Sequence, residues 1–357
     1  MKHLYRLSYV LLLAVFPFTV AFADYLVVSR KATVKEQPEK KAKIIERVQK
    51  GDTLTLLDNG SQQNGYYHVT GPKTNKGGWI YRTLVRRYEE ETIATTSSSA
   101  CDPDDIIVTD IEWTSTIPAG YYDGTANLTG AELKTSLYNI IKGHMEFNYT
   151  SSTSTDVWDI LKEADRAPGC PEYVKLLYTN RMRNAAEEYN YGKGWTREHV
   201  WAKSHGDFGT TKGAGTDAHH LRPADASVNS ARNNKDFDDG GTEYIDGDYP
   251  TGCKRDVDSW EPQDSEKGDV ARMLFYMAVR YEGENDEPDL ELADSVNTYP
   301  ALLHGKLSAL LQWHQLDPVD NWERRRNDII YTDFQGNRNP FIDHPEFVDK
   351  IWGNQIY

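Results

Sequence analysis

Short apolar runs and glycine-rich breaks alternate over residues 24–88. Apolar residues concentrate in four runs, at positions 44–48, 53–57, 66–69 and 78–81. Gly, Asn and Asp residues fill the segments between the runs, as expected for turns. Strands this short and this evenly spaced are typical of a small closed barrel. The pattern therefore predicts an all-β domain in the first quarter of the chain.

The hydrophobic pattern of residues 118–357 has a helical period instead. Residues 128–133, LTGAEL, hold both halves of a capping box, which predicts the start of a helix. Apolar positions then recur at helical spacing in 133–141, 270–281 and 302–311. We expect these three stripes to form core helices and not a cofactor site. This part of the chain is thus predicted to be a helix-rich α+β domain.

Two further segments have the composition of neither domain. Residues 1–23 carry Lys2 and Arg6, then an almost purely apolar run, then small residues before Asp24. This order is that of a signal peptide, so we expect export to the periplasm or the extracellular space. Residues 89–117 are rich in Glu, Ser, Thr and Asp, which predicts a solvated linker. Beyond the signal no apolar run is long enough to cross a bilayer, so stable membrane insertion is not expected.

Charge and cysteine content narrow the possible classes of protein. The net charge of the chain is −15, but residues 24–90 hold 13 basic and 8 acidic side chains, whereas residues 91–357 hold 25 and 47. A uniformly basic nucleic-acid binder is therefore excluded. Three cysteines, Cys101, Cys170 and Cys253, are too few for a disulfide-dense fold. Export would allow one pair to form, and we expect Cys170 with Cys253, because both lie in the second domain.

Ionisable and amide side chains crowd into two blocks between Arg197 and Phe237. A Gly- and Thr-rich loop separates the first block, REHVWAKSH, from the second, DAHHLRPADASVNSARNN. We predict a strand in the first block, and a strand followed by a helix in the second, so that the first block faces the helix. His199 can accept a proton near neutral pH. Glu198 and Asn229 offer the oxygen ligands that Mg²⁺ prefers, with water at its remaining positions.

These two blocks resemble the endonuclease I family of His-Me finger (ββα-metal) nucleases. WEPQDSEKGDVARMLFYM at 260–277 and ERRRNDIIYTDFQGNRNPFIDHPEF at 323–347 extend the resemblance over nearly the whole second domain. The resemblance implies a ββα-metal nuclease fold and non-specific hydrolysis of DNA, and often of RNA. It also implies His199 as the general base, with Glu198 and Asn229 as ligands of one Mg²⁺, for which Mn²⁺ or Ca²⁺ could substitute.

Further residues are candidates for supporting roles. Arg222 and Arg232 are candidates for phosphate contact, and the spacing alone does not say which would meet the leaving group. His219 and His220 fit a bracing role behind the site. The three arginines at 324–326 could follow a nucleic-acid backbone or could form salt bridges within a helix. Because the second domain is strongly acidic, substrate binding would rely on a local cationic strip.

The first domain resembles a bacterial SH3-like domain, through AKIIERVQKGDTLTLL, GYYHV and KGGWIYRTLV. That resemblance implies a binding module, often for peptidoglycan or another envelope polymer. The leading hypothesis is thus a secreted endonuclease that acts on DNA and RNA with one Mg²⁺ and a histidine base. Two alternatives stay open. One is a peptidoglycan hydrolase with Cys170 as its nucleophile, and the other is a non-catalytic envelope-binding protein.

Overall fold

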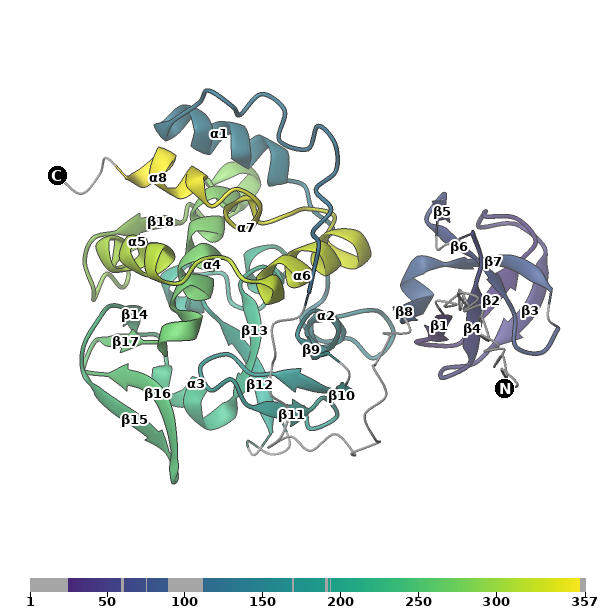
Figure 1. The fold of residues 1–357 in the computed structure, drawn as a ribbon, viewed down its shortest axis with the longest axis horizontal. Helices are drawn as coiled ribbons and strands as arrows, with labels where there is room; N and C mark the ends of the chain where they lie inside the picture. Colours follow the sequence, from purple (N-terminus) through teal and green to yellow (C-terminus); the bar gives the residue numbers. More distant parts are fainter. Residues whose placement is uncertain are drawn as a thin grey trace, which may run out of the picture. The chain divides into compact units, whose positions relative to one another are not determined.

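Two compact units make up the protein, Met1–Ala94 and Thr95–Tyr357 (Figure 1). Each unit has its own hydrophobic core. The computed structural model describes residues 25–58, 61–74, 76–88, 112–168, 170–189, 192 and 194–353. The predicted signal peptide and most of the predicted linker lie outside the described residues.

The first unit is an antiparallel sheet of eight short strands. Their order is β3-β2-β7-β6-β4-β1-β8, with β5 paired to β6. Burial alternates along several strands, because successive side chains point to opposite faces of a sheet. The prediction of an all-β domain is confirmed, and the four predicted strands correspond to β3, β4, β6 and β7. The strands are β1 (Tyr25–Val28), β2 (Ala32–Lys35), β3 (Ile44–Val48), β4 (Thr53–Leu56), β5 (Gln62–Gln63), β6 (Tyr66–Thr70), β7 (Gly77–Tyr81) and β8 (Val85–Tyr88).

The second unit combines helices with several small sheets, as predicted for a helix-rich α+β domain. Its helices are α1 (Gly130–Ile141), α2 (Val157–Ala164), α3 (Ala226–Arg232), α4 (Lys267–Arg280), α5 (Leu307–Leu316), α6 (Asn321–Ile329), α7 (Pro340–Asp343) and α8 (Glu346–Trp352). Its strands are β9 (Arg166–Ala167), β10 (Cys170–Lys175), β11 (Met182–Asn184), β12 (Trp195–His199), β13 (Leu221–Asp225), β14 (Asp236–Phe237), β15 (Thr242–Asp246), β16 (Tyr249–Arg255), β17 (Ser259–Glu261), β18 (Glu291–Ala293) and β19 (Leu303–Gly305).

Helix α4 forms the centre of the second core, since every residue from 268 to 280 is buried. The apolar stripe at 270–281 is thus a core helix, as predicted. Helix α1 begins after Thr129, also as predicted, but the Thr129 side chain makes no capping hydrogen bond. Helix α5 begins only at Leu307. The first part of the stripe at 302–311 was therefore misassigned, because β19 takes Leu303 into a parallel pairing with β18.

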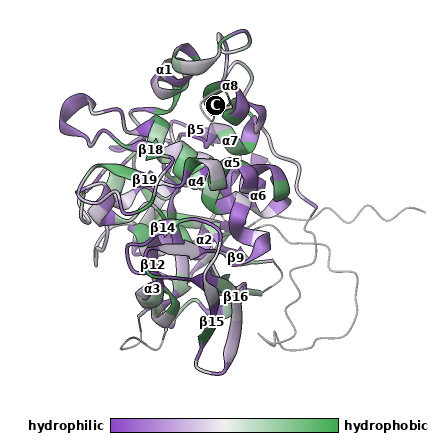
Figure 2. Ribbon diagram, turned by 90° about the vertical axis from the view of Figure 1, so that its left-hand side faces the viewer, coloured by the Kyte–Doolittle hydropathy of each residue, from purple (hydrophilic) through white to green (hydrophobic). Residues whose placement is uncertain are grey.

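Helix α6 is hydrophilic in sequence (Figure 2), yet most of it is buried. Arg325 donates to the carbonyl of Ala164 (3.2 Å), and Arg326 forms an ion pair with Asp165 (3.1 Å). Arg324 donates to the side chain of Asn321. Arg325 and Arg326 therefore connect α6 to the end of α2 and the segment after it, and are too buried to follow a nucleic-acid backbone, whereas the contact of Arg324 lies within α6.

The start of the second unit lies earlier than residue 118. Trp113 Nε1 and Ser115 Oγ both donate to the carboxylate of Asp328, at 2.8 Å each. Arg338 in turn donates to Ser115 Oγ (3.0 Å). The last residues of the predicted linker are thus fixed to the second unit.

The cysteines do not pair as expected. Cys170 is disulfide-bonded, whereas Cys253 is a free thiol. Cys253 is fully buried on β16, where its Sγ donates to the carbonyl of Tyr178 (3.2 Å). Location in the same domain was too weak a basis for predicting the disulfide pair, because the core packs around Cys253 and buries its thiol.

None of the described helices combines the length and the apolar character that crossing a membrane requires.

Candidate active site

The two polar blocks of the sequence meet where β12 and β13 pair and α3 follows (Figure 1). The strands are antiparallel, and His199 at the end of β12 lies opposite Leu221 at the start of β13. Helix α3 begins directly after β13, and Asn229 Nδ2 donates to the carbonyl of Arg197 at 3.5 Å. The strand, strand and helix predicted for these blocks are therefore present, and they bring Asn229 to the strand that carries Glu198 and His199.

The imidazole of His199 is held in a defined protonation state. Its Nε2 lies 3.1 Å from the carbonyl oxygen of Gly215. Because a carbonyl can only accept, Nε2 must carry the hydrogen, which leaves a lone pair on Nδ1. Burial lowers the pKa of His199 well below its usual range, and the neighbouring His220 contributes to the shift. At neutral pH the ring is thus neutral, with Nδ1 as its basic atom.

Glu198 is a buried carboxylate with two donors on one of its oxygens. Tyr178 OH donates to Oε1 (2.8 Å), and the guanidinium of Arg232 lies 3.3 Å from the same atom. Burial raises the pKa of Glu198, although the charge of Arg232 and the hydrogen bond from Tyr178 lower it in part. A further positive charge near this carboxylate would favour its ionised form. The position is therefore suited to a cation.

Arg232 does not occupy the exposed position that phosphate contact requires. Its side chain is 1% exposed and lies under the end of β12. It donates to the carbonyls of His199 (3.1 Å) and Val200 (2.9 Å), besides its contact with Glu198. The structure thus brings Arg232 to the site as a support of β12 and not as a group that faces substrate.

Arg222 is turned away from solvent altogether. It is 0% exposed, and its Nε lies 2.8 Å from Asp165. Asp269 (3.4 Å) and Glu266 (3.9 Å) approach its terminal nitrogens. Burial would lower the pKa of Arg222, but these three carboxylates raise it above its usual range. Its charge is therefore balanced internally, and the structure does not place it for phosphate contact.

His219 and His220 use their ring nitrogens within the fold. His220 Nε2 donates to the carbonyl of Ala214 (2.8 Å), and its Nδ1 accepts from the backbone of Trp201 (3.3 Å). His219 Nε2 donates to the carbonyl of Asn337 (3.1 Å). Burial lowers the pKa of each to about 4, so both are neutral. Their geometry suits the bracing role.

Known proteins match the part of the chain that carries this site. The family model of Endonuclease I matches residues 129–346. The chain belongs to the Endonuclease I family. The family match thus contains all of the elements described above as the site, and it supports a nucleic-acid hydrolase.

Two Bacillus proteins are similar to this Endonuclease I family member. An "Extracellular ribonuclease" from Bacillus subtilis (strain 168) is 57% identical over 232 residues, which is 65% of this chain and 78% of the relative. An "Extracellular ribonuclease" from Bacillus amyloliquefaciens is 55% identical over 234 residues, with the same shares. An "Endonuclease-1" from Buchnera aphidicola subsp. Baizongia pistaciae (strain Bp) is 28% identical over 131 residues, 36% of this chain and 46% of the relative.

Three residues of the family member's site were missed from sequence. Tyr178, which donates to Glu198, lies at the end of the mostly apolar segment VKLLY and has no distinguishing pattern. The ring of Tyr149 stacks on His199, with centroids 5.6 Å apart. Lys203 is exposed, and its charge acts on both Glu198 and His199. Of these three residues, only Lys203 could have been proposed from the sequence, because it lies four residues after His199 in the first polar block.

The disulfide removes one alternative function. A peptidoglycan hydrolase that used Cys170 would need a free thiolate at that position, but Cys170 is disulfide-bonded. The free Cys253 cannot replace it, because burial raises the pKa of its thiol to about 12. The hypothesis of a cysteine hydrolase is therefore wrong.

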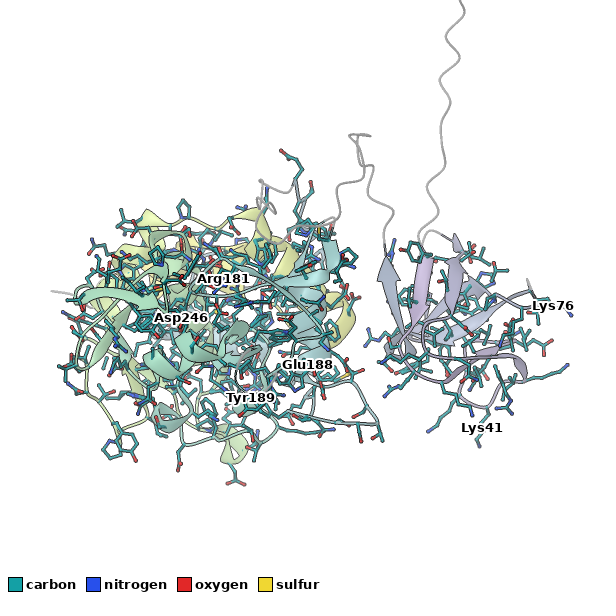
Figure 3. All side chains as sticks on the ribbon, turned by 90° about the horizontal axis from the view of Figure 1, so that it is seen from below. Lys41, Lys76, Arg181, Glu188, Tyr189 and Asp246 are labelled. Carbon is teal, nitrogen blue, oxygen red and sulfur yellow. The ribbon has the colours of Figure 1, made fainter. Side chains whose placement is uncertain are left out.

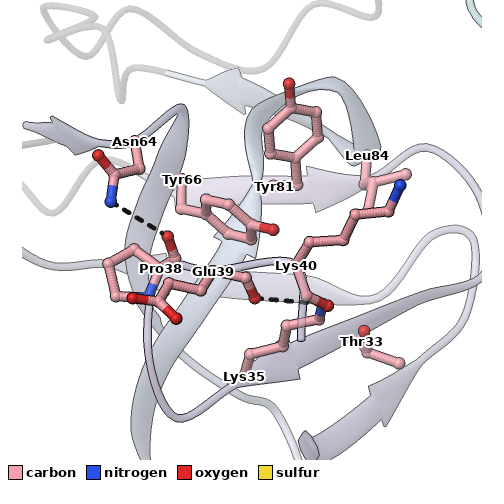
Figure 4. A pocket seen from close by; sticks show the side chains of 9 residues that line it. All are labelled: Thr33, Lys35, Pro38, Glu39, Lys40, Asn64, Tyr66, Tyr81 and Leu84. Carbon is pink, nitrogen blue, oxygen red and sulfur yellow. Dashed lines mark hydrogen bonds between the residues drawn. The ribbon is translucent and has the colours of Figure 1, made fainter. Parts of the chain in front are cut away.

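Each unit also contains a cavity of about 650 Å³. The cavity of the second unit is lined by the loop that holds Phe208 and Ala214 and by acidic residues, among them Glu146, Asp286 and Glu287. The cavity of the first unit is shown in Figure 4, and its lining residues are Thr33, Lys35, Pro38, Glu39, Lys40, Asn64, Tyr66, Tyr81 and Leu84. Lys41 and Lys76 extend from the same unit into solvent (Figure 3).

Proposed function

We propose that this protein is an exported nuclease that hydrolyses phosphodiester bonds in RNA and DNA, with His199 as general base and one Mg²⁺ held by Glu198 and Asn229. The observation that carries the proposal is the His199 tautomer, in which the bond from Nε2 to the carbonyl of Gly215 leaves Nδ1 as a base on the residue that follows the buried Glu198. Family membership and the extracellular ribonuclease names of two relatives support the substrate class and export.

The donor atoms left at the site fit a hard divalent cation. The side chains of Tyr178 and Arg232 both contact Oε1 of Glu198, so the lone pairs of Oε2 are not used by these two donors and can bind a cation. Asn229 donates through Nδ2 to the carbonyl of Arg197, which leaves its amide oxygen. One carboxylate and one amide oxygen suit Mg²⁺, which keeps several waters when bound. A cation bound there would stabilise charge on the phosphoryl oxygens and on the leaving oxygen.

The side chains around the site then have separate tasks. His199 Nδ1 accepts a proton from the attacking water, and its lowered pKa keeps it unprotonated at neutral pH. Tyr149 and Phe208 flank the imidazole, with ring centroids 5.6 Å and 6.2 Å away, and restrict its movement. Lys203, the exposed cation nearest to this group in sequence, attracts a phosphate of the substrate.

Incubation of the mature protein with plasmid DNA and with single-stranded RNA tests the proposal. We expect cleavage of both substrates in Mg²⁺ and none after addition of a chelator, because the phosphoryl charge is then left without the cation. Intact substrates in Mg²⁺, Mn²⁺ and Ca²⁺ alike would contradict it and would favour a non-catalytic envelope-binding protein.

For the first unit we propose an SH3-like binding module whose cavity takes peptidoglycan or another envelope polymer. Tyr66 and Tyr81 line that cavity as an edge-to-face pair, with ring centroids 5.0 Å apart, and Tyr81 is 38% exposed (Figure 4). An exposed aromatic ring in a cavity with polar neighbours is suited to stacking on a ligand. The full chain should pellet with purified cell-wall sacculi and Tyr81→Ala should not; equal pelleting of the two would contradict this assignment.

A further inference from the structure

A continuous chain of buried contacts runs from Asp236 to Glu198. Asp236 Oδ1 lies 2.7 Å from His304 Nδ1, and His304 Nε2 lies 3.0 Å from a terminal nitrogen of Arg232. The other terminal nitrogen of Arg232 lies 3.3 Å from Glu198 Oε1. All four side chains are 2% exposed or less. Groups from β14, β19, α3 and β12 thus meet without intervening solvent.

The direction of each hydrogen bond in this chain is fixed by Arg232. A guanidinium has donors only, so His304 Nε2 must accept from it. The hydrogen of the neutral imidazole is then on Nδ1, which donates to Asp236. Asp236 also accepts from the backbone of Gly305 (3.0 Å) and Asn297 (2.8 Å), so it is held from three sides.

The same residues include a group that has the spacing of a metal site. The ligand atoms of His205, Asp236 and His304 all lie within 4.8 Å of one another. However, a metal at His304 Nδ1 would move the hydrogen to Nε2, where it would face the guanidinium of Arg232. Both ring nitrogens of His205 face backbone carbonyls, at 2.8 and 2.9 Å. The hydrogen-bond geometry therefore favours a network without a metal.

Arg232 is the point at which this network reaches the site. It lies one turn after Asn229 on α3, and it donates to the backbone of His199 and Val200 as well as contacting Glu198. Its position thus determines where the carboxylate of Glu198 lies relative to Asn229. Residues behind metal ligands commonly set the affinity of a site in this way.

We propose that Asp236, His304 and Arg232 form a positioning relay that orients Glu198 for cation binding. The inference rests on the proposed function, because Glu198 and Asn229 are taken as the cation ligands. His304 and Asp236 act through Arg232 and touch no reacting atom. Loss of the relay should therefore weaken cation binding by about 10- to 100-fold, the range typical for outer partners of metal ligands, while the rate at saturating cation changes little.

The test compares His304→Ala and His304→Gln in the full mature chain. Mn²⁺ affinity is measured by calorimetry, and the Mn²⁺ concentration for half-maximal cleavage is measured separately. We expect His304→Ala to raise the Mn²⁺ dissociation constant and the half-maximal Mn²⁺ concentration by about tenfold or more. His304→Gln should restore most of the affinity, because its side-chain oxygen can still accept from Arg232. If His304→Ala fails to fold, Arg232→Lys provides a second variant. Lysine lacks the guanidinium fork that contacts both His304 and Glu198.

His314→Ala is the matched control, since His314 is also buried and contacts a buried arginine, Arg272, at 3.4 Å. It should lower the melting temperature without changing Mn²⁺ affinity. A lower melting temperature with unchanged Mn²⁺ affinity in His304→Ala would overturn the relay in favour of a purely structural role. A second bound metal ion in the wild type, in addition to the one at Glu198, that is absent from His304→Ala would also overturn it, in favour of a metal site at His205, Asp236 and His304. Normal Mn²⁺ binding by a protein that cleaves nothing would instead refute the proposed function and leave the relay intact.

Discussion

Two buried arginines from the same sequence block have different surroundings. Arg222 faces Asp165, Asp269 and Glu266, so its positive charge is balanced by carboxylates. Arg232 faces one carboxylate, that of Glu198, and otherwise donates to backbone carbonyls and to an imidazole. We call the first region the carboxylate cluster and the second the β12 clamp.

The difference shows that the role of a buried arginine depends on the groups it contacts and not on its place in a sequence motif. In the carboxylate cluster the three acids balance the positive charge of Arg222, so this arginine needs no phosphate as a counterion. The cluster therefore stabilises the fold. In the β12 clamp the guanidinium fixes the strand that carries Glu198 and His199, so it serves the site. Substitutions in the cluster should therefore change stability, and substitutions at the site should change activity.

The largest effect is expected for His199→Ala. It removes Nδ1, the proposed base, and a positioned base contributes about 10²–10⁴-fold to the rate. The cleavage rate should fall by that factor, while the melting temperature stays close to that of the wild type. His344→Ala is the control, because its histidine is partly exposed and lies 3.2 Å from Glu346, outside the candidate site. A His199→Ala protein that cleaves at the wild-type rate would remove His199 from the role of base.

Arg222→Met should destabilise the fold and spare the chemistry. It leaves the three carboxylates of the cluster without their shared cation, and breaking a buried ion pair costs about 3–5 kcal/mol. The free energy of unfolding should fall by that amount in urea, and the rate per folded molecule should be unchanged. Arg324→Met, at a less buried arginine that contacts Asn321, should stay within about 0.5 kcal/mol of the wild type. Lost activity in a fully folded Arg222→Met would return Arg222 to the site.

Stability should fall as pH falls below 6.5, because the histidines behind the site are buried and neutral. Burial lowers the pKa of His219, His220 and His304 to about 4, against an ordinary value of 6.5. Between these values the unfolded chain binds more protons than the folded one, so acid favours unfolding by up to about 1.4 kcal/mol per pH unit for each histidine. Melting temperatures measured from neutral pH down to pH 4 should decrease, and less steeply in His219→Gln. A flat profile would contradict the assignment of neutral histidines.

The smallest effect is expected for Lys203→Ala. The predicted arginines are buried, whereas Lys203 is exposed and its charge acts on both Glu198 and His199. Removal of one phosphate contact should weaken RNA binding and reduce the slope of log K against log salt by about 0.7. Lys76→Ala on the first unit is the control. An unchanged slope in Lys203→Ala would place substrate binding elsewhere.

Local patterns predicted much of the fold and the motif of the site. Four strands of the first unit and the core helix α4 were visible as apolar periods, and the block around Glu198, His199 and Asn229 predicted the two strands and helix that bring them together. The orientation of Arg222 was not predictable, because Asp165 and Asp269 come from distant segments. The same holds for Tyr178 and His304, whose roles depend on contacts between separate elements.

Calorimetric titration of Mn²⁺ into the wild type, Glu198→Gln and Asn229→Ala tests most directly whether the two side chains share one cation. Glu198→Gln keeps the shape of the side chain and removes its charge, while Asn229→Ala removes the amide oxygen. The wild type should bind one ion, and each variant should bind it at least about tenfold more weakly, as loss of a ligand costs no less than loss of an outer partner. Wild-type affinity in both variants would place the cation elsewhere and contradict the account.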